Sequence, residues 1–412
     1  MQTYYKPIPG LSAIQSATFI GLFRDYEQEL VEAGYNGQVV RLHLRSVAHF
    51  GIWLELQGVA LEAMDDQGVA AVDRHRLSCR CPGASRDNGR HVICCIRVFL
   101  AFLRERRLVA AHAPPEPHRL VCGFLDWMST QRGVVDTTLT AYRYYVTALV
   151  DSLGGDPQAY TSRDLRDFVA QRYRHYGRHS IRMVLAAVRM FLRYLAMEGR
   201  CRPGLEQALV SPASWSQHSL PRGLSPEQVE RILAACPSTP RGIRDRAILL
   251  LLIRLGLRAG DVAALCFSDV DFEAGTIQVA GKGGREARLP LPQDVGDALL
   301  EYFDTARPRV PSAQVFLRSV APFKPFTGAQ AGHAITHVAR AALKRAGVQP
   351  PIRGAHVFRH TAACQMLRQG VGLEEIAAVL RHRSIETTAL YAKVDLQGLA
   401  QVVQPWPEVT PC

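Results

Sequence analysis

Six residues in the second half of the chain have the types and the order needed for chemistry at a phosphate group. In chain order they are Arg258, Lys282, His356, Arg359, His382 and Tyr391. A phenol oxygen can attack phosphorus and form a covalent ester, which keeps the bond energy for a rejoining step without ATP. Fixed cations can stabilise the charge on the other phosphate oxygens in place of a metal. The set therefore indicates transesterification of a phosphodiester.

The spacing of these residues supports this interpretation, although each residue also has a simpler one. His356 and Arg359 are three positions apart and would share one face of a helix. Lys282 lies in a glycine-rich turn, where its amine can act as a general acid, which a guanidinium does poorly. The simpler alternatives are that Arg258 and Lys282 are solvated turn residues and that Tyr391 packs at the end of an amphipathic helix. Only the complete set favours chemistry.

The elements around these residues predict a mainly α-helical fold with one small antiparallel β-sheet, over a domain of residues 218–405. The apolar stretch 247–257 is typical of a buried helix, and Arg258 follows it at a glycine-containing turn. The segments TIQVA and REARLPL flank GKGG, which indicates two strands joined by a hairpin turn. Ser225 followed by proline predicts the start of the first helix of this domain.

Residues 118–202 predict a separate bundle of four helices, preceded by a proline-rich linker. Thr161 with Asp164 three positions later predicts a capping box, and Asp136 predicts another helix N-cap. Arginines concentrate towards the end of this block, and a cationic rim on short helices is typical of a DNA-binding surface. The alternative is a solvated basic face. The candidate DNA-binding residues are Arg172, Arg174, Arg178, Arg182 and Arg189.

Residues 1–110 predict an N-terminal helical module. Its apolar patterns place helices near residues 36–58, 65–76 and 92–107. The order and lengths of these patterns faintly repeat those of residues 118–202. The module is therefore either a second DNA-binding bundle of the same kind or an unrelated helical bundle that looks similar at this level.

One group of cysteines and a histidine in this module has the residue types of a zinc site: Cys79, Cys81, His91, Cys94 and Cys95. Its spacing matches no common zinc-finger pattern, and the adjacent Cys94 and Cys95 cannot easily both reach one metal. We therefore expect a polar loop that leads into an apolar helix, and no metal or other cofactor in the chain.

The composition is compatible with a polyanionic partner. The 412 residues carry a formal net charge of +12, and the sequence pI is about 9.4. The longest apolar stretch, at 247–257, is interrupted by Arg254 and is too short to span a bilayer. No secretory signal is visible at the N-terminus, and ten cysteines without a compact framework are typical of reduced thiols. We expect a cytoplasmic protein with no membrane partner.

The order and local context of the six residues resemble those of the tyrosine recombinase (phage integrase) family. The motifs that carry the resemblance are LGLRAGDVAAL, GKGGREARLPL, HVFRHTAA and LRHRSIETTALY. The resemblance is close over the C-terminal domain and looser over residues 118–202, which are similar to the family's core-binding domain. Two departures stand out: Asp261 lies where the family more often has glutamate, and Arg381 lies where it usually has glycine.

The resemblance implies a role for each residue of the set. Arg258 and Arg359 would clamp the scissile phosphate, and Asp261 would hold Arg258 through a carboxylate–guanidinium pair. Lys282 would protonate the leaving 5′ oxygen, and His356 would act as a base or phosphate ligand. His382 and Tyr391 complete the set, with Tyr391 as the nucleophile. His360, beside Arg359, is expected to be structural.

The activity implied is site-specific recombination of double-stranded DNA through a 3′-phosphotyrosine intermediate, for the integration or transposition of a mobile element. Because strand exchange between two duplexes needs four active sites, the resemblance also implies a homotetramer on DNA, with or without related recombinase subunits. Two alternatives remain open from the sequence. One is a DNA relaxer similar to type IB topoisomerases, and the other is a DNA-binding accessory subunit without catalytic activity.

Overall fold

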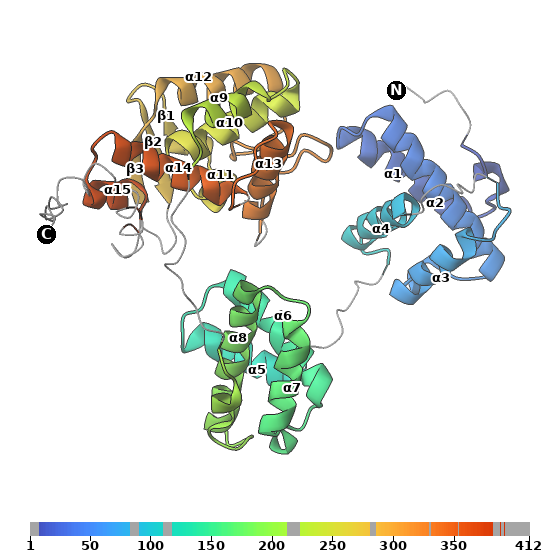
Figure 1. The fold of residues 1–412 in the computed structure, drawn as a ribbon. Coiled ribbons are helices and arrows are strands. Elements are labelled where there is room, and N and C mark those ends of the chain that lie inside the picture. The colour runs from blue at the N-terminus through green and yellow to red at the C-terminus, as the bar shows by residue number, and fades with distance from the viewer. Residues whose placement is uncertain are drawn as a thin grey trace, which may run out of the picture. The chain divides into compact units, whose positions relative to one another are not determined.

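The computed structural model describes residues 8–82, 90–109, 118–211, 223–280, 286–328, 331–352 and 354–381, together with Thr388 and Tyr391 (Figure 1). Two of the predicted site residues, Lys282 and His382, lie outside these residues. The chain divides into two compact units, Ala113–Ser219 and the combination of Met1–His112 with Leu220–Cys412. The second unit contains two separate large hydrophobic cores, one for each of its segments.

The N-terminal segment contains four helices: α1 (Ala17–Glu32), α2 (Gly37–Gln57), α3 (Asp66–Arg76) and α4 (Arg90–Glu105). Side chains of Ser16, Asn36 and Asp65 accept hydrogen bonds from amides of the first turns of α1, α2 and α3, which fixes where these helices begin. The sequence patterns located the last three helices and missed α1, although its buried Phe19 and Phe23 lie at helical spacing.

The unit Ala113–Ser219 is a bundle of α5 (Arg119–Thr130), α6 (Asp136–Leu153), α7 (Ser162–Tyr173) and α8 (Arg178–Met197). The predicted capping box of Thr161 and Asp164 is confirmed. The predicted cap at Asp136 is wrong by one position, because Val135 is the N-cap and Asp136 is the first helical residue. Three pairs pack as in α1–α4: first on second, second on fourth, and third on fourth; in addition, α6 packs on α7.

The C-terminal segment contains the predicted helix start at Ser225, which is confirmed, and the structure adds a capping box between Ser225 and Gln228. Its helices are α9 (Pro226–Ala234), α10 (Pro240–Arg254), α11 (Ala259–Ala264), α12 (Gln293–Glu301), α13 (Ala331–Arg345), α14 (Ala355–Arg368) and α15 (Leu373–Val379), with a π-helical turn at Tyr302–Ala306. In the described parts of the chain, short 3₁₀ turns lie at Leu11–Ala13, Leu61–Ala63, Pro157–Ala159, Leu205–Ala208 and Phe267–Asp269.

The strands of this segment form one antiparallel sheet in the order β1 (Val270–Asp271), β2 (Thr276–Ala280) and β3 (Glu286–Pro290). Ile277 pairs with Leu289, and both side chains are buried in the core. The predicted antiparallel pairing of the strands in TIQVA and REARLPL is therefore confirmed, as is the mainly α-helical fold class; the predicted turn at GKGG lies outside the described residues.

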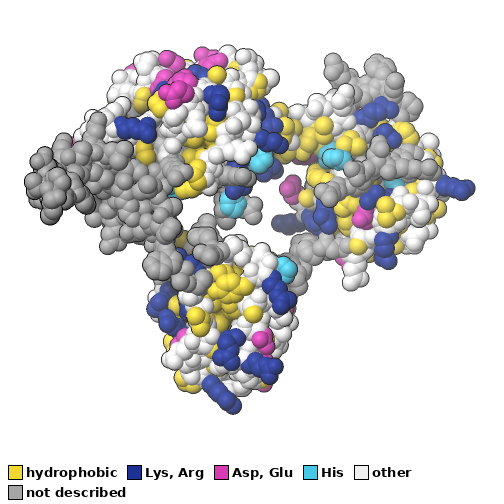
Figure 2. Space-filling model, in the orientation of Figure 1, with side chains coloured by type: hydrophobic (Ala, Val, Ile, Leu, Met, Phe, Trp, Pro, Cys, Tyr) yellow, Lys and Arg dark blue, Asp and Glu magenta, His cyan; other side chains and the backbone are white. Residues whose placement is uncertain are grey.

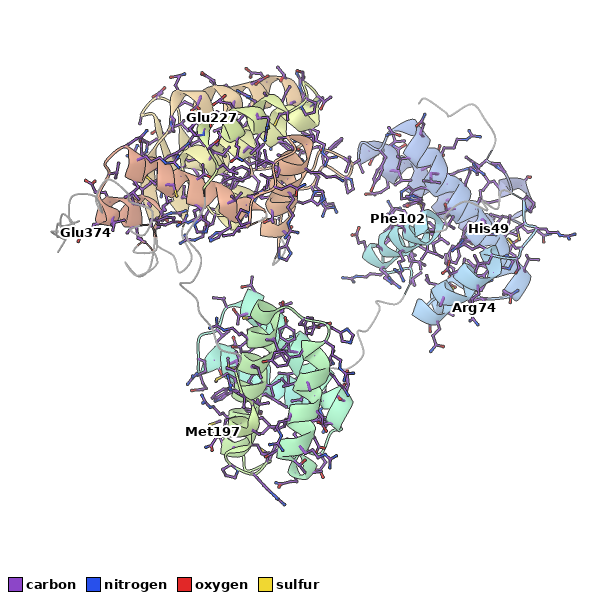
Figure 3. All side chains as sticks on the ribbon, viewed as in Figure 1. His49, Arg74, Phe102, Met197, Glu227 and Glu374 are labelled. Atoms are coloured by element: carbon purple, nitrogen blue, oxygen red, sulfur yellow. The ribbon has the colours of Figure 1, made fainter. Side chains whose placement is uncertain are left out.

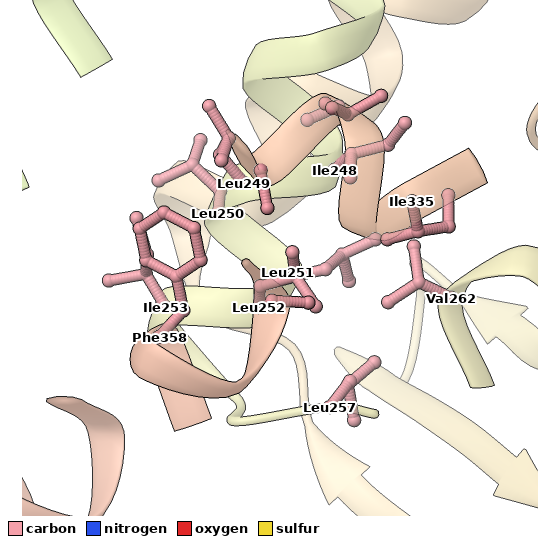
Figure 4. Close-up of a cluster of buried hydrophobic side chains, with 14 of the residues drawn as sticks. Ile248, Leu249, Leu250, Leu251, Leu252, Ile253, Leu257, Val262, Ile335 and Phe358 are labelled. Atoms are coloured by element: carbon pink, nitrogen blue, oxygen red, sulfur yellow. The ribbon is translucent and has the colours of Figure 1, made fainter. Parts of the chain in front are cut away.

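Helix α10 lies at the centre of the C-terminal core. Its residues 247–253 are all buried, and α11, α12, α13 and α14 contact it. Figure 4 shows these side chains beside Phe358 of α14 and Ile335 of α13. Each large apolar side chain that is fully buried stabilises the fold by about 1.5–3 kcal/mol. The core therefore fixes the end of α10, where the turn that carries Arg258 begins.

Among the described residues, no helix has the length and apolar character needed to cross a membrane.

Candidate active site

Arg359 joins three parts of the C-terminal segment that are distant in sequence. It lies on α14 with only 4% of its surface exposed. Its Nη1 donates to the carbonyl oxygen of Gly256, after α10, at 2.6 Å, and its Nη2 donates to the carbonyl oxygen of Leu380, after α15. Gly256 has a φ of +58°, and a Cβ there would lie 2.6 Å from Leu380. The positive φ and the nearby Leu380 side chain therefore both favour glycine at this turn.

Arg258 occupies the N-cap position of α11 and is turned towards the same place. Its Nη2 donates to the carbonyl oxygen of Arg381 at 2.9 Å. The carboxylate of Asp261 accepts from the backbone amide of Arg258 at 3.2 Å, and its ion pair is with the side chain of Arg381. The predicted pairing of Asp261 with the guanidinium of Arg258 is therefore wrong. The shorter aspartate caps its own helix and binds Arg381 instead.

The backbone at Arg381 has a conformation that favours glycine, the residue that the resemblance leads one to expect at this position. Its φ is +52°, in the left-handed region that glycine enters without steric cost. The conformation brings its carbonyl to Arg258 and its side chain to Asp261, and the side chains of this ion pair are each 10% exposed. The Nε and Nη1 atoms of Arg381 are buried without a hydrogen-bond partner among the described residues. Both nitrogens carry N–H donors that these contacts leave unused.

The three arginines form a cationic cluster that one carboxylate does not neutralise. Desolvation, followed by the charges of Arg258 and Arg381, lowers the pKa of Arg359 to about 10. Desolvation also lowers the pKa of Arg258, and Asp261 opposes this shift. Buried cations that depress one another's pKa gain stability from an added anion. The cluster therefore fits a bound phosphodiester.

His356 lies on the exposed side of α14, three residues before Arg359. Enough protein surrounds its ring that desolvation, together with the charges of Arg359 and Arg258, lowers its pKa. The ring is therefore neutral near pH 7, and one nitrogen can accept a proton or a hydrogen bond. The structure thus brings His356, Arg258 and Arg359 together, as predicted, with Arg381 as a fourth member.

Tyr391 is buried beside these residues, with only 2% of its surface exposed, in a small apolar cluster with Cys364 and Leu380. Its hydroxyl lies 2.8 Å from Nδ1 of His360. Desolvation raises the pKa of Tyr391 to about 12, against the opposing charge of Arg359. The phenol is therefore held in its protonated form.

His360, which was predicted to be structural, is buried and contacts Tyr391, a contact that the sequence did not reveal. Desolvation, then the charges of His356 and Arg359, lowers the pKa of His360 to about 4. In the tautomer with its proton on Nε2, the neutral ring accepts a hydrogen bond from the Tyr391 hydroxyl at Nδ1. Its spacing was the available signal, because His356 and His360 are four residues apart and share a helix face. Their ring centroids are 4.5 Å apart.

Among the candidate DNA-binding arginines, Arg189 is occupied within its own bundle. Its Nη2 donates to the carbonyl oxygen of Leu209 at 2.6 Å, and the side chain is half-buried. A guanidinium that holds a backbone carbonyl in place is a poor candidate for reaching a DNA backbone.

The other four candidates differ in their surroundings. Arg174 and Arg182 are exposed, and the guanidinium of Arg172 lies 5.0 Å from the ring centroid of Phe168. Arg178 begins α8, and its side chain is outside the described set. Figure 2 shows Lys and Arg side chains spread over the visible face of this bundle rather than gathered in one patch. The face therefore offers a diffuse positive field.

Comparison with known proteins gives consistent matches. Residues 222–397 match the phage integrase family, and residues 121–199 match the SAM-like N-terminal domain of phage integrases. The chain is 35% identical to a putative integrase/recombinase, y4rA, of Sinorhizobium fredii, over 93% of each chain. It is 31% identical to the tyrosine recombinase XerD of Xanthomonas campestris, over 72% of this chain and 94% of the relative.

Solved structures share the fold. A lambda integrase dimer bound to a COC′ core site has a TM-score of 0.53 at 17% identity, covering 71% of this chain and 99% of the other. XerH recombinase bound to a difH substrate, in a post-cleavage complex, has a TM-score of 0.51 at 16% identity, covering 74% and 88%. The chain belongs to the phage integrase family and is a tyrosine recombinase, an enzyme that cleaves and rejoins DNA strands.

Proposed function

We propose that this recombinase cleaves DNA through a 3′-phosphotyrosine at Tyr391 and serves the integration or transposition of a mobile element. The observation that carries the catalytic part is the meeting of three arginines with a buried tyrosine and two neutral histidines. The relatives named integrases, and a structural neighbour described as the integrase of the Tn1549 transposon, support the biological role.

Arg258 and Arg359 act as the phosphate clamp in this proposal. Their guanidinium groups are held by backbone carbonyls, so they are oriented before substrate binds. Preorganised donors stabilise the charge that develops on the non-bridging oxygens. The unpartnered Nε and Nη1 of Arg381 extend the clamp. His356 contacts the phosphate or accepts a proton, whereas Asp261 positions Arg381 and α11.

Lys282 and His382 complete the set on the basis of the sequence resemblance. Lys282 would lie in the turn between β2 and β3 and protonate the leaving 5′ oxygen. His382 follows Arg381 directly in the sequence, and its role rests on the resemblance alone. Neither role involves a metal, because the cations of the clamp supply the required charge.

Tyr391 must change its position or surroundings before it can attack. Its hydroxyl is directed at His360, and its surface is covered by the apolar cluster around Cys364 and Leu380. Reaction with a scissile phosphate requires this hydroxyl to reach the clamp. We infer that DNA binding releases Tyr391 from His360, so that the free protein holds its nucleophile away from water and adventitious electrophiles.

The domain organisation in this proposal has three parts: residues 1–110, 118–202 and 218–405. The described residues of the first two form four-helix modules that share three pairs of packed helices, which supports a shared DNA-binding role. Arg172, Arg174, Arg178 and Arg182 are the proposed backbone contacts of the second module. The net charge of +12 favours such non-specific attraction.

The assembly proposed is a homotetramer on two duplexes of the recombination site, with or without related recombinase subunits. Complete strand exchange between two duplexes needs four active sites, and each chain offers one. Structural neighbours include a lambda integrase tetramer bound to a Holliday junction. We propose that the protein works in the cytoplasm, where bacterial genomic DNA is found.

A suicide substrate tests the proposed reaction. A nicked duplex site loses a short strand after cleavage, so the covalent protein–DNA adduct accumulates and can be seen on a denaturing gel. The expected result is an adduct with a nicked site and recombinant joints with two intact sites. No adduct with any site cloned from the flanks of the element would indicate an inactive accessory subunit. An adduct without joints would indicate a relaxing enzyme.

A further inference from the structure

Two histidines and two cysteines converge in the N-terminal helical segment, far in sequence from the recombinase residues. His49 lies on α2, His75 in the last turn of α3, and Cys79 and Cys81 in the turn that follows α3. One ligand atom from each lies within 4.8 Å of every other. His49 is labelled on α2 in Figure 3.

The structure places Cys79 and Cys81 with partners other than those considered from the sequence. The sequence interpretation combined Cys79 and Cys81 with His91, Cys94 and Cys95 and rejected that set on its spacing. Among the described residues, the group that could hold a metal replaces the last three with His49 and His75. His49 is 26 residues before His75, so no compact spacing pattern could have revealed it. Helices α2 and α3 both pack on α4, and this tertiary packing places His49 beside the end of α3.

The geometry is that of a tetrahedral site. Nε2 of His49 lies 3.3 Å from Sγ of Cys79, and Nε2 of His75 lies 3.3 Å from Sγ of Cys81. In a tetrahedral zinc site, bonds of about 2.0 Å to nitrogen and about 2.3 Å to sulfur put neighbouring ligand atoms about 3.5 Å apart. Two of the distances between ligand atoms are therefore already close to those of a zinc site, and the remaining distances, all within 4.8 Å, need to shorten only slightly.

The local structure explains why the four side chains meet. The amide of Cys79 donates to the carbonyl oxygen of His75 at 3.0 Å, which folds the chain back after α3 and turns Cys79 and Cys81 towards His75. His49 is 3% exposed and fixed in the core of α2. The rings of His49 and His75 are tilted by 35°, with centroids 5.6 Å apart. The fold thus brings the four ligand atoms together.

The chemistry of the donor set selects the ion. Two thiols and two imidazoles, without a carboxylate, suit zinc, and four protein ligands leave no position for water or substrate. Without an ion, the same contacts would be two weak thiol–imidazole hydrogen bonds, which give no reason for the two pairs to converge. We propose that His49, His75, Cys79 and Cys81 bind one structural zinc ion that ties α2 to the end of α3.

Metal analysis of the full chain tests this proposal. Protein purified without a histidine tag or chelator is expected to carry one zinc per chain by elemental mass spectrometry. Replacement of zinc by cobalt is expected to give the intense visible bands of a tetrahedral ion and a thiolate-to-cobalt charge-transfer band. Absence of both stoichiometric zinc and the charge-transfer band would overturn the proposal.

Three variants identify the ligands. The double variant Cys79→Ser/Cys81→Ser is expected to lose zinc, whereas Cys94→Ser, which removes an exposed thiol outside the group, is expected to keep it. His75→Cys supplies a third thiolate and is expected to retain metal while strengthening the cobalt charge-transfer band. This gain cannot come from misfolding. An unchanged band in His75→Cys, or zinc retained in the double variant, would place the metal elsewhere and overturn the assignment.

Discussion

The hydrogen bond between Tyr391 and His360 predicts a specific dependence of stability on pH. The pKa of His360 falls from an ordinary value of 6.5 to about 4 in the folded protein, because desolvation and then the charges of His356 and Arg359 disfavour its cation. The unfolded chain therefore takes up a proton at higher pH than the folded chain does. The contribution of the neutral His360 ring to the free energy of unfolding is therefore complete above pH 6.5 and is lost as the pH falls towards 4.

The size of this loss follows from the pKa difference. Each unit of pKa is worth about 1.4 kcal/mol, so His360 should cost about 3 kcal/mol of unfolding free energy between pH 6.5 and pH 4. Other groups titrate in this range, and the difference between matched variants removes them. His360→Asn keeps an acceptor close to the position of Nδ1 but cannot titrate. The variant should therefore retain the contact with Tyr391 and lose the acid sensitivity.

Hydrogen exchange of peptides from α14, followed as a function of urea, measures this free energy for the correct segment. We expect the wild-type value to fall more steeply with acidification than the value for His360→Asn. His356→Asn is the control for the neighbouring ring, whose pKa is also lowered. Parallel decline of wild type and His360→Asn would refute the reasoning, because it would show that His360 keeps an ordinary pKa or is already solvated.

Three further predictions concern the clamp and the proton donor. Replacing Arg381 removes a largely buried ion pair with Asp261 and should lower the free energy of unfolding by about 3 kcal/mol. Arg381→Gly should be more stable than Arg381→Ala by about 1 kcal/mol, because the φ of residue 381 is +52°. Hydrogen exchange of α14 measures both differences, and equal stabilities of the two variants would contradict backbone strain at this turn. The cleavage rate of Lys282→Ala should be restored by a substrate with sulfur at the 5′ bridging position, because this leaving group needs little protonation. On the same substrate, Arg258→Ala should stay slower than wild type by about a hundredfold. Equal rescue of both variants would show that another residue is the general acid. Cleavage rates should not change when magnesium is omitted, and a rate restored by magnesium would indicate a nuclease-type mechanism.

The sequence predicted those parts of the structure that depend on local chemistry. The helix start at Ser225, the two antiparallel strands on either side of GKGG and the buried helix that contains the apolar residues from 247 onwards follow from short patterns, and the structure contains all three. The association of His356 with Arg359 also follows from helical spacing. Such features need no knowledge of which distant segments meet.

The features that the sequence did not predict depend on tertiary packing. The partner of Asp261 is Arg381, 120 residues away, and only the meeting of two turns decides between it and Arg258. The contact of His360 with Tyr391 depends on how the end of the chain returns to α14. His49 joins Cys79 only because three helices pack together. Pairings of this kind have no signature in spacing along the chain.

The identity of the nucleophile is the central claim, and a covalent-adduct assay with Tyr391→Phe tests it most directly. The substitution keeps the ring that fills the apolar cluster and removes the oxygen that attacks phosphorus. Tyr144→Phe, which removes an exposed hydroxyl from another unit, is the matched control. On a nicked suicide substrate we expect no adduct with Tyr391→Phe, an unchanged adduct with Tyr144→Phe, and site binding retained by both. An adduct that persists with Tyr391→Phe would show that another residue attacks the DNA and would contradict the account.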